Sequence, residues 1–199
     1  MRLPLPTWQG KISVEQAIKQ RRTTRSFHSR ALNLNQLSQL LWAASGTTEE
    51  NGCKRAAPSA GALYPMDLYV VAGQNSVPSI EAGVYHYEPG KHQLSEVLKG
   101  DTRIAVARAS LSQMWMAGAP ITMIITAEYK RATGKYGKRG IRYAMIEAGH
   151  IGQNIFLQAQ ALDLEAGIVG AFHDAEIIDA INIPSVHEPI LLMPVGYPG

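Results

Sequence analysis

Residues 21–27 concentrate side chains that can bind anions. The segment holds three cationic side chains and three hydroxyls within seven residues: Arg21, Arg22, Arg25, Thr23, Thr24 and Ser26. Guanidinium groups and hydroxyl donors match the geometry of phosphate oxygens, so the segment is a candidate phosphate site. A solvated basic loop and a basic patch for RNA or DNA are the alternatives. The nucleic-acid alternative is the weaker one, because no basic stretch interleaved with aromatic residues follows elsewhere.

Two further segments combine small residues with accessible backbone. The first runs from residue 58 to residue 65, between two prolines, and begins with Pro58, Ser59, Ala60 and Gly61. Prolines favour a fixed, extended loop, and small side chains would let a flat ligand lie against its backbone. The alternative is a simple turn before a strand. The second segment is a turn with bare amides that contains Gly170 and Ala171.

Potential metal ligands and reactive groups are sparse in this sequence. Glu147 and His150 have the spacing of half a di-iron carboxylate site, but no second such pair exists, so metal binding is not expected. Cys53 is the one cysteine, which excludes an internal disulfide and favours an incidental loop thiol. Lys135 and Tyr136 lie in a cationic segment, residues 128–141, for which a solvated loop is the alternative to a functional role.

Composition limits the class of protein. A chain of 199 residues with 46% hydrophobic and 18% charged residues is typical of one globular domain, residues 1–199. No apolar run approaches the roughly 18 to 20 residues that cross a bilayer, and the N-terminus lacks a signal-peptide core, so we expect a cytoplasmic protein without membrane contact. The net charge of +3 suggests a mild preference for anionic partners but does not identify nucleic acid.

One long helical pattern, residues 142–163, would position these groups. Its apolar residues recur every three or four positions, which predicts a helix that is buried on most sides. A narrow polar row remains: Glu147, His150, Asn154 and Gln158. Gly149 and Gly152 each cost roughly 1 kcal/mol in a helix interior. Close approach of the backbone of a partner helix would explain these glycines. That partner helix would lie in the same chain or in the second copy of a symmetric dimer.

The other elements predict an α+β fold. Ser13 and Asn33 are candidate N-caps of helices that end near residues 20 and 45, and Gly46 would end the second one. Further helices are expected at residues 101–110 and 174–181, strands at 66–72, 121–127 and 189–195, and a hairpin at 83–94. Pro89 and Gly90 would be the two central residues of the hairpin turn. The pattern favours an antiparallel or mixed sheet sandwiched by helices over a doubly wound parallel sheet.

Taken together, these segments resemble the nitroreductase family of flavin enzymes, and within it the SagB-type azoline-dehydrogenase branch. The match covers nearly the whole chain, and six motifs occur in the expected order. They are residues 21–27 (RRTTRSF), 58–65 (PSAGALYP), 83–87 (GVYHY), 135–143 (KYGKRGIRY), 147–154 (EAGHIGQN) and 170–172 (GAF). The resemblance implies a nitroreductase-like fold, with the long helix at the interface of a homodimer and one FMN at each of two sites between the subunits.

The resemblance also assigns roles to individual residues. Arg21 and Thr23, with Arg22 beside them, would meet the FMN phosphate, and Arg25 would lie near the pyrimidine edge of the isoalloxazine. The other subunit would press Pro58, Ser59, Ala60 and Gly61 against the ring. The amides of Gly170 and Ala171 would address N5 and O4, and Gln113 would bond the pyrimidine edge. Many relatives carry a Lys or Arg after the final strand, whereas this sequence ends at Gly199, so Arg21 and Arg22 must suffice or the phosphate is held more weakly.

The implied activity is an oxidoreductase that passes hydride through flavin N5 by a ping-pong mechanism. Its substrate would be a nitro, quinone or azoline compound, with NAD(P)H as a possible reductant. In the azoline-dehydrogenase branch, a pair equivalent to Lys135 and Tyr136 is associated with proton removal from the substrate, and these are the expected catalytic residues. The sequence also lacks the extra domains of peptide-modifying relatives, which favours a small-molecule substrate. The alternative is a non-catalytic flavin- or nucleotide-binding protein of the same fold.

Overall fold

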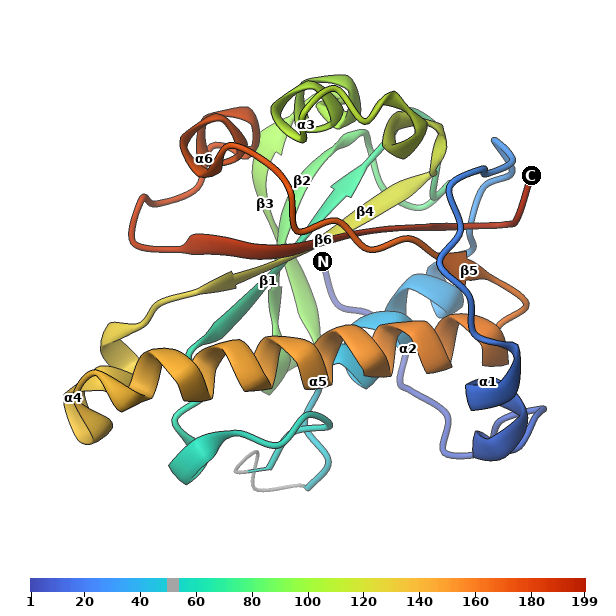
Figure 1. The fold of residues 1–199 in the computed structure, drawn as a ribbon. Helices are drawn as coiled ribbons and strands as arrows, with labels where there is room; N and C mark the ends of the chain where they lie inside the picture. The colour runs from blue at the N-terminus through green and yellow to red at the C-terminus, as the bar shows by residue number, and fades with distance from the viewer. Residues whose placement is uncertain (50–53) are drawn as a thin grey trace.

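The computed structural model describes residues 1–49 and 54–199 and is built around one antiparallel sheet (Figure 1). The sheet has six strands in the order β3-β2-β1-β4-β6-β5. The strands are β1 (Met66–Ala72), β2 (Gly83–Glu88), β3 (Gln93–Lys99), β4 (Ile121–Ala127), β5 (Glu165–Ala166) and β6 (Glu188–Gly196). The helices are α1 (Val14–Gln20), α2 (Leu34–Ser45), α3 (Arg103–Ala109), α4 (Lys130–Tyr136), α5 (Arg139–Ala161) and α6 (Asp174–Ile181), with short 3-10 turns η1 (Ala60–Ala62), η2 (Pro89–Lys91) and η3 (Met114–Gly118).

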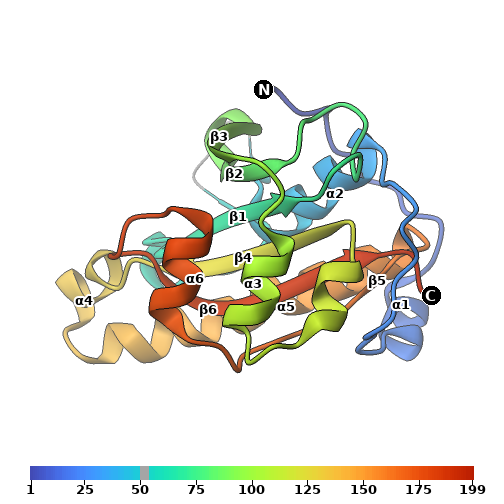
Figure 2. The ribbon, with the colours of Figure 1, turned by 90° about the horizontal axis from the view of Figure 1, so that it is seen from above.

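Helices cover both faces of the sheet, which confirms the α+β prediction (Figures 1 and 2). Side chains of successive strand residues point to opposite faces of the sheet, so each central strand contributes side chains to two hydrophobic cores. In β1, Leu68 and Val70 belong to the core on the side of α2 and α5, whereas Tyr69 and Val71 belong to the core beneath α3 and α6. β4 is buried along its whole length, as expected for a central strand.

The helix ends follow the capping chemistry of the sequence. Ser13 accepts a hydrogen bond from the backbone N–H of Gln16 and begins α1. Asn33 and Gln36 form a complete capping box at α2, which ends at Gly46. These interactions are local in sequence, so the predicted boundaries of both helices are confirmed.

The hairpin between β2 and β3 turns at Pro89 and Gly90, as predicted, and the 3-10 turn η2 extends the turn to Lys91. Two local predictions were wrong. The segment between β4 and α5 contains helix α4 and is not merely a loop. The turn after α5 contributes the two-residue strand β5 to the sheet edge. The interpretation of Cys53 lies outside the described residues.

Helix α5 has a buried side and an exposed side. Ala144, Ala148, Ile151 and Ile155 are buried in the core, as predicted. The opposite side exposes large apolar side chains, with Met145 53% and Ile146 50% exposed, so the helix is not buried on most sides within one protomer. Among the described helices, none combines the length and apolar character needed to span a bilayer.

Gly149 and Gly152 of α5 do not meet another helix in this chain. A Cβ at Gly152 would contact the side chains of Leu191 and Met193 on β6, at 3.4 and 3.5 Å. A Cβ at Gly149 would meet nothing within 4 Å, because this residue faces the exposed side. The predicted close backbone partner is therefore absent within the described part of the protomer, and only the surface around Gly149 remains open to a second copy.

Candidate functional site

Three segments that are distant in sequence meet at the outer edge of the sheet. Thr23 forms a parallel bridge to Ala166 in β5, and the Thr24 N–H donates to the Ala166 carbonyl at 3.0 Å. The Thr24 hydroxyl also bonds to the Glu165 carboxylate. A Cβ at Gly167 would lie 2.7 Å from the Trp115 ring, so glycine permits η3 to pack closely here. We call residues 21–25, 113–115 and 165–171 the arginine half-site.

The guanidinium groups of the three arginines in this half-site point in different directions. The Arg21 guanidinium lies over the Phe156 ring at 5.2 Å, and the Arg25 guanidinium lies over the Trp115 ring at 5.9 Å. Aromatic faces attract cations and leave the guanidinium edges free to donate. Arg22, in contrast, donates to the carbonyls of Lys19 and Arg21. The structure thus brings two of the three predicted arginines to aromatic rings and turns the third back toward α1.

Gln113 joins the arginine half-site through a strained turn. Its side-chain amide donates to the Ser110 carbonyl at 3.0 Å and to the Ala171 carbonyl at 3.2 Å. Leu111 and Ser112 both have positive φ, of 53° and 57°. Such backbone is costly for residues other than glycine and concentrates at functional sites. Ala171 and Gly170 are exposed, as the predicted amide donors must be.

The proline-flanked loop, residues 58–65, forms a second group on α5. The Ser59 hydroxyl accepts from the Tyr64 N–H at 2.9 Å, which closes the loop on itself. Gly61, Ala62 and Tyr64 have positive φ values of 63°, 52° and 47°. Strained backbone is thus found in both parts of the molecule that the sequence predicted to bind a ligand.

Lys135 and Tyr136 lie beside this loop, in the last turn of α4. A Cβ at Gly61 would lie 2.5 Å from the Tyr136 hydroxyl and 3.1 Å from the Lys135 ammonium, so only glycine leaves room for both side chains. Lys135 is exposed and Tyr136 is half-buried. We call the 58–65 loop with these two residues the lysine-tyrosine half-site.

Sequence reasoning missed Arg131, which fixes α4 to the sheet and to the loop. Its guanidinium pairs with the Asp67 carboxylate at 2.8 Å and with the Glu128 carboxylate at 2.7 Å. It also donates to the Tyr64 carbonyl at 3.3 Å. The only local signal was the three-residue spacing of Glu128 and Arg131, which cannot reveal Asp67.

A buried carboxyl lies beneath the 58–65 loop. Glu147 is 3% exposed, and its burial raises the pKa to about 7, while hydrogen bonding from Ser59 and the charge of Arg55 oppose that shift. Burial also lowers the pKa of the Arg55 guanidinium, which lies 4.3 Å from the Tyr64 ring centroid. Glu147 is therefore buried inside the protomer, whereas His150, three residues further along α5, is exposed.

The two half-sites lie on different sides of α5 within one protomer. Ser59 acts on the pKa of Glu147, and Arg21 contacts Phe156, nine residues further along the helix. At 1.5 Å and 100° per residue, those positions are about 14 Å apart and face opposite directions. Figure 1 shows the same separation, with η1 beneath α5, α4 at its left end, and β5 with the chain leaving α1 at its right end. The helix itself lies between the two half-sites.

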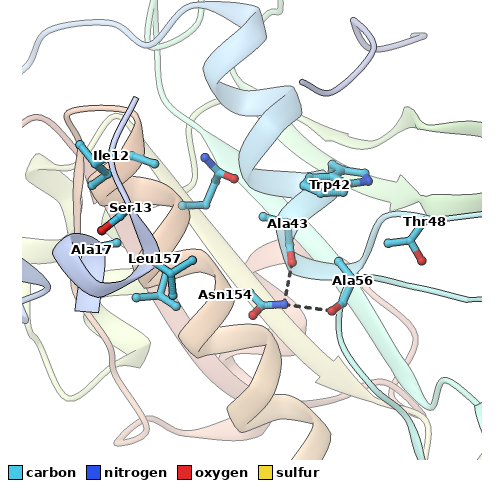
Figure 3. Close-up of a pocket in the computed structure, with 12 residues that line it drawn as sticks. Ile12, Ser13, Ala17, Trp42, Ala43, Thr48, Ala56, Asn154 and Leu157 are labelled. Atoms are coloured by element: carbon cyan, nitrogen blue, oxygen red, sulfur yellow. Dashed lines mark hydrogen bonds between the residues drawn. The ribbon is translucent and has the colours of Figure 1, made fainter. Parts of the chain in front are cut away.

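A cavity of about 370 Å³ opens between α1, α2 and α5 (Figure 3). Asn154 spans it, donating to the carbonyls of Ala43 at 2.9 Å and Ala56 at 3.4 Å. The lining is mostly apolar and includes Trp42 and Leu157, and no predicted site residue is among it. Asn154 thereby connects α5 to the residues just before the 58–65 loop. The hydrogen bonds across the cavity support the site, and the cavity itself is not the site.

One group of metal-ligand type occurs among the described residues. Ligand atoms of Asp67, Glu128 and His187 lie within 4.8 Å of one another. Arg131 pairs with both carboxylates, so a cationic side chain already lies between them. Glu147 and His150, the pair with di-iron spacing, belong to no such group among the residues that the structure describes.

Comparison with known proteins identifies the family. The profile of the Nitroreductase family matches residues 18–197. A protein of Methanocaldococcus jannaschii that is provisionally named a nitroreductase is 43% identical over 196 residues, covering 98% of this chain and 96% of its own length. The microcin B17-processing protein McbC of Escherichia coli is 26% identical over 76% of this chain, which corresponds to 57% of McbC.

Solved structures agree with the family profile. A nitroreductase structure from Ralstonia eutropha superposes with a TM-score of 0.83 at 26% identity, over 99% of this chain and 88% of its own. A chain of the Escherichia coli microcin synthetase McbBCD complex with truncated pro-MccB17 superposes with a TM-score of 0.77 at 23% identity, over 97% of this chain and 75% of its own, which shows the shared fold. With the architecture described above, these matches establish that the chain belongs to the nitroreductase family.

Proposed function

We propose that this chain is an FMN-dependent oxidoreductase whose two active sites each form between two copies of the chain. The observation that carries the proposal is the separation of the two half-sites by α5. One copy offers cations, hydroxyls and exposed amides, and the other offers a thin loop with a lysine and a tyrosine. A symmetric pair would bring one half-site of each kind together twice.

The residues present fit FMN. Arg21, Arg25 and the Thr23 hydroxyl are the cationic and hydroxyl donors that a phosphate and an electron-rich ring edge require. A Cβ at Gly170 would meet nothing within 4 Å, so a ligand can approach that backbone closely. Gly61 of the other half-site is exposed, but its Cβ position is already taken by the Tyr136 hydroxyl and the Lys135 ammonium. When bound, FMN would accept and return a hydride, which no side chain can do.

The arginine half-site would tune this chemistry electrostatically. A fixed Arg25 cation near the pyrimidine edge favours the negative charge that reduction places there. The Trp115 ring beneath its guanidinium limits the directions that the cation can take. Arg21 and Thr23 would hold the phosphate, with the role of Arg22 reduced because its guanidinium donates to helix carbonyls.

The lysine-tyrosine half-site would act on the substrate. Aromatising an azoline removes a ring proton while hydride leaves for the cofactor, so a proton acceptor must face the open side of the site. Lys135 and Tyr136 lie together beside the 58–65 loop and are suitably exposed for this role. The likeness to the microcin B17-processing protein McbC supports an azoline-type substrate.

Reduction of nitro or quinone compounds by NAD(P)H is the second candidate. It is favoured by the nitroreductase name of the relative that matches almost end to end. Both reactions would use one site in two half-reactions, with the first product leaving before the second substrate binds, so ping-pong kinetics are expected for either.

The visible spectrum of the purified protein tests the proposal. We expect a yellow protein, release of FMN identified by mass after denaturation, and bleaching of the bound flavin by NADH, NADPH or an azoline. A yellow protein that none of these compounds bleaches would support a binding role without catalysis. A colourless protein that takes up no added FMN would overturn the proposal.

A further inference from the structure

Helix α4 carries Lys135 and Tyr136 but is too short to hold them in place by itself. It has seven residues, no side chain caps its N-terminus, and Gly137 ends it at a φ of 55°. Isolated helices of this length are not stable in water. The positions of the lysine and the tyrosine therefore depend on what holds α4 against the rest of the protein.

Arg131, in the first turn of α4, connects the helix to two other parts of the chain. Its guanidinium pairs with the Asp67 carboxylate of β1 at 2.8 Å and donates to the Tyr64 carbonyl of the 58–65 loop at 3.3 Å. Its third partner, the Glu128 carboxylate at 2.7 Å, lies only three residues earlier in the same segment. Of these partners, Asp67 is the charged group that belongs to a strand, so it links α4 ionically to the sheet.

Asp67 is itself held by other groups of the sheet and its edge. One carboxylate oxygen accepts a hydrogen bond from His86 Nε2 of β2 at 3.0 Å, and His187 Nε2 lies 3.8 Å from the oxygen that pairs with Arg131. His187 is in turn bonded through Nδ1 to the Tyr69 hydroxyl at 2.6 Å. Because the Asp67 side chain is 11% exposed, salt and water screen its pair with Arg131 only weakly.

Arg131 and the proposed proton acceptors lie against the same loop. Lys135 follows Arg131 by four residues, so the two side chains share one face of α4. The Tyr136 hydroxyl and the Lys135 ammonium lie 2.5 and 3.1 Å from the position of a Cβ on Gly61. Gly61 belongs to the loop whose Tyr64 carbonyl accepts from Arg131. Arg131 thus fixes both the helix and the loop that together define the place of the acceptor pair.

We propose that Asp67 and Arg131 are positioning residues for proton removal, because their ion pair fixes Lys135 and Tyr136 beside the 58–65 loop. The inference rests on the proposed function, with an azoline as the substrate. Neither residue of the ion pair would touch the substrate or the cofactor. A displacement of reacting groups by about 1 Å can cost about a hundredfold in rate, so the ion pair should act on the rate of proton removal.

Single-turnover reduction of the bound flavin tests the inference, with 2-phenylthiazoline-4-carboxamide as the azoline probe. Aromatisation breaks the C4–H bond, whose proton goes to the side-chain base, and the C5–H bond, whose hydride goes to FMN. We expect Asp67→Asn and Arg131→Gln each to slow this reduction by about ten- to a hundredfold, with the apparent dissociation constant of the probe little changed. Reduction by NADH or NADPH needs no such base and should keep its wild-type rate.

Three further readouts separate positioning from a general loss of stability. Deuterium at C4 should slow the reduction more in Arg131→Gln than in the wild type, because proton removal becomes the slower step. Combining Asp67→Asn with Arg131→Gln should cost no more than Arg131→Gln alone, because both changes break one ion pair. Arg131→Lys keeps the charge but not the planar fork, so it should restore only part of the rate.

Arg103→Gln is the matched control. Arg103 pairs with Asp101 at 2.6 Å and donates to the Ala119 carbonyl at 2.9 Å, at the start of α3 on the other face of the sheet (Figure 1). This variant should keep the wild-type ratio of the thiazoline rate to the NAD(P)H rate. An equal loss in Arg103→Gln, or a wild-type ratio in Asp67→Asn and Arg131→Gln, would overturn the inference while leaving FMN binding established. If Arg131→Gln fails to fold, Arg131→Lys retains the charge and provides the same ratio.

The position of Tyr136 can also be measured without the reaction. In full-length protein labelled with fluorotyrosine, the ¹⁹F resonance that disappears in Tyr136→Phe reports the surroundings of this ring. It should shift in Asp67→Asn and Arg131→Gln and stay in place in Arg103→Gln, and an unmoved resonance in the first two variants would contradict the positioning role. A wild-type protein that binds FMN but is not reduced by the thiazoline would overturn the azoline activity and this inference together, while NAD(P)H-driven reduction would stand.

Discussion

At the scale of single residues, the arginine half-site separates side chains that look equivalent in the sequence. Arg22 and Arg25 are three positions apart, yet one donates to helix carbonyls and the other lies over Trp115. Only a cation held beside the open part of the site can act on a bound cofactor. The proposed electrostatic role therefore belongs to Arg25, and it can be measured by removing that charge.

We expect Arg25→Ala to slow flavin reduction by at least about tenfold, since losing a fixed charge at a developing anion typically costs 1.4 kcal/mol or more. The fold should be retained, because Arg25 is exposed. Stopped-flow reduction with the best reductant is the measurement. Arg2→Ala, which removes an exposed arginine far from this half-site, is the control. A wild-type rate of flavin reduction in Arg25→Ala would contradict the proposed electrostatic role of Arg25.

For Lys135→Ala and Tyr136→Phe, we expect loss of azoline oxidation with NAD(P)H-driven reduction retained, because only the first reaction removes a carbon-bound proton. The two turnover numbers, measured on the same preparation, provide an internal control. If azoline oxidation persists in both variants, the cationic segment before α5 has no catalytic role.

At the scale of elements, glycine makes the packing of α4 against the 58–65 loop possible. Gly61 combines a φ of 63° with a neighbour, the Tyr136 hydroxyl, that leaves no room for a Cβ. Arg131 then holds α4 in place through Asp67, Glu128 and the Tyr64 carbonyl. The loop and α4 are therefore one unit, and a change in either should displace the other.

We expect Gly61→Ala to destabilise the protein by about 1 to 2 kcal/mol through its left-handed backbone and to weaken FMN binding as the loop shifts. Gly90→Ala is the matched control, since its Cβ would meet nothing within 4 Å. Chemical unfolding and FMN titration measure the two effects. Equal stability and affinity in both variants would contradict the close packing of loop and helix.

At the scale of the whole molecule, the exposed side of α5 can explain how the half-sites meet. Ile141, Met145 and Ile146 expose apolar surface on the helix that separates the two half-sites, and Gly149 beside them is open. A contiguous apolar surface of this kind is a candidate interface between proteins. Pairing two copies along this side would be consistent with the proposed dimer.

We expect Met145→Glu with Ile146→Glu to yield a monomer that binds no FMN, because buried charges oppose pairing and one copy lacks a complete site. Sedimentation velocity and flavin content provide the measurement. Charge substitution at Ile104, an exposed apolar residue on α3, is the control and should leave a loaded dimer. A monomer that retains FMN would contradict the shared site.

Mixing chains gives a sharper version of the same prediction. Arg25→Ala and Gly61→Ala damage different half-sites, so a mixed dimer has one site with both defects and one intact site. Random pairing of equal amounts should restore about a quarter of the wild-type sites. Complete absence of restored activity after verified exchange would place both half-sites in one chain.

The sequence by itself determined the elements. Hydrophobic periodicity and caps depend on residues within a few positions of one another, so α2, α5, β1 and β4 were predictable. The small-residue segments at 58–61 and 170–171 were also recognisable, because backbone freedom is a property of the residues themselves.

Only the tertiary structure decided which of these segments meet. It placed Arg131 on Asp67 and Thr24 on Ala166, across separations that no local pattern encodes. It also buried Glu147 within the protomer and left Met145 outside, although the two are neighbours on one helix. The reason is that burial and pKa depend on what packs against a side chain, and that is fixed only when distant elements assemble.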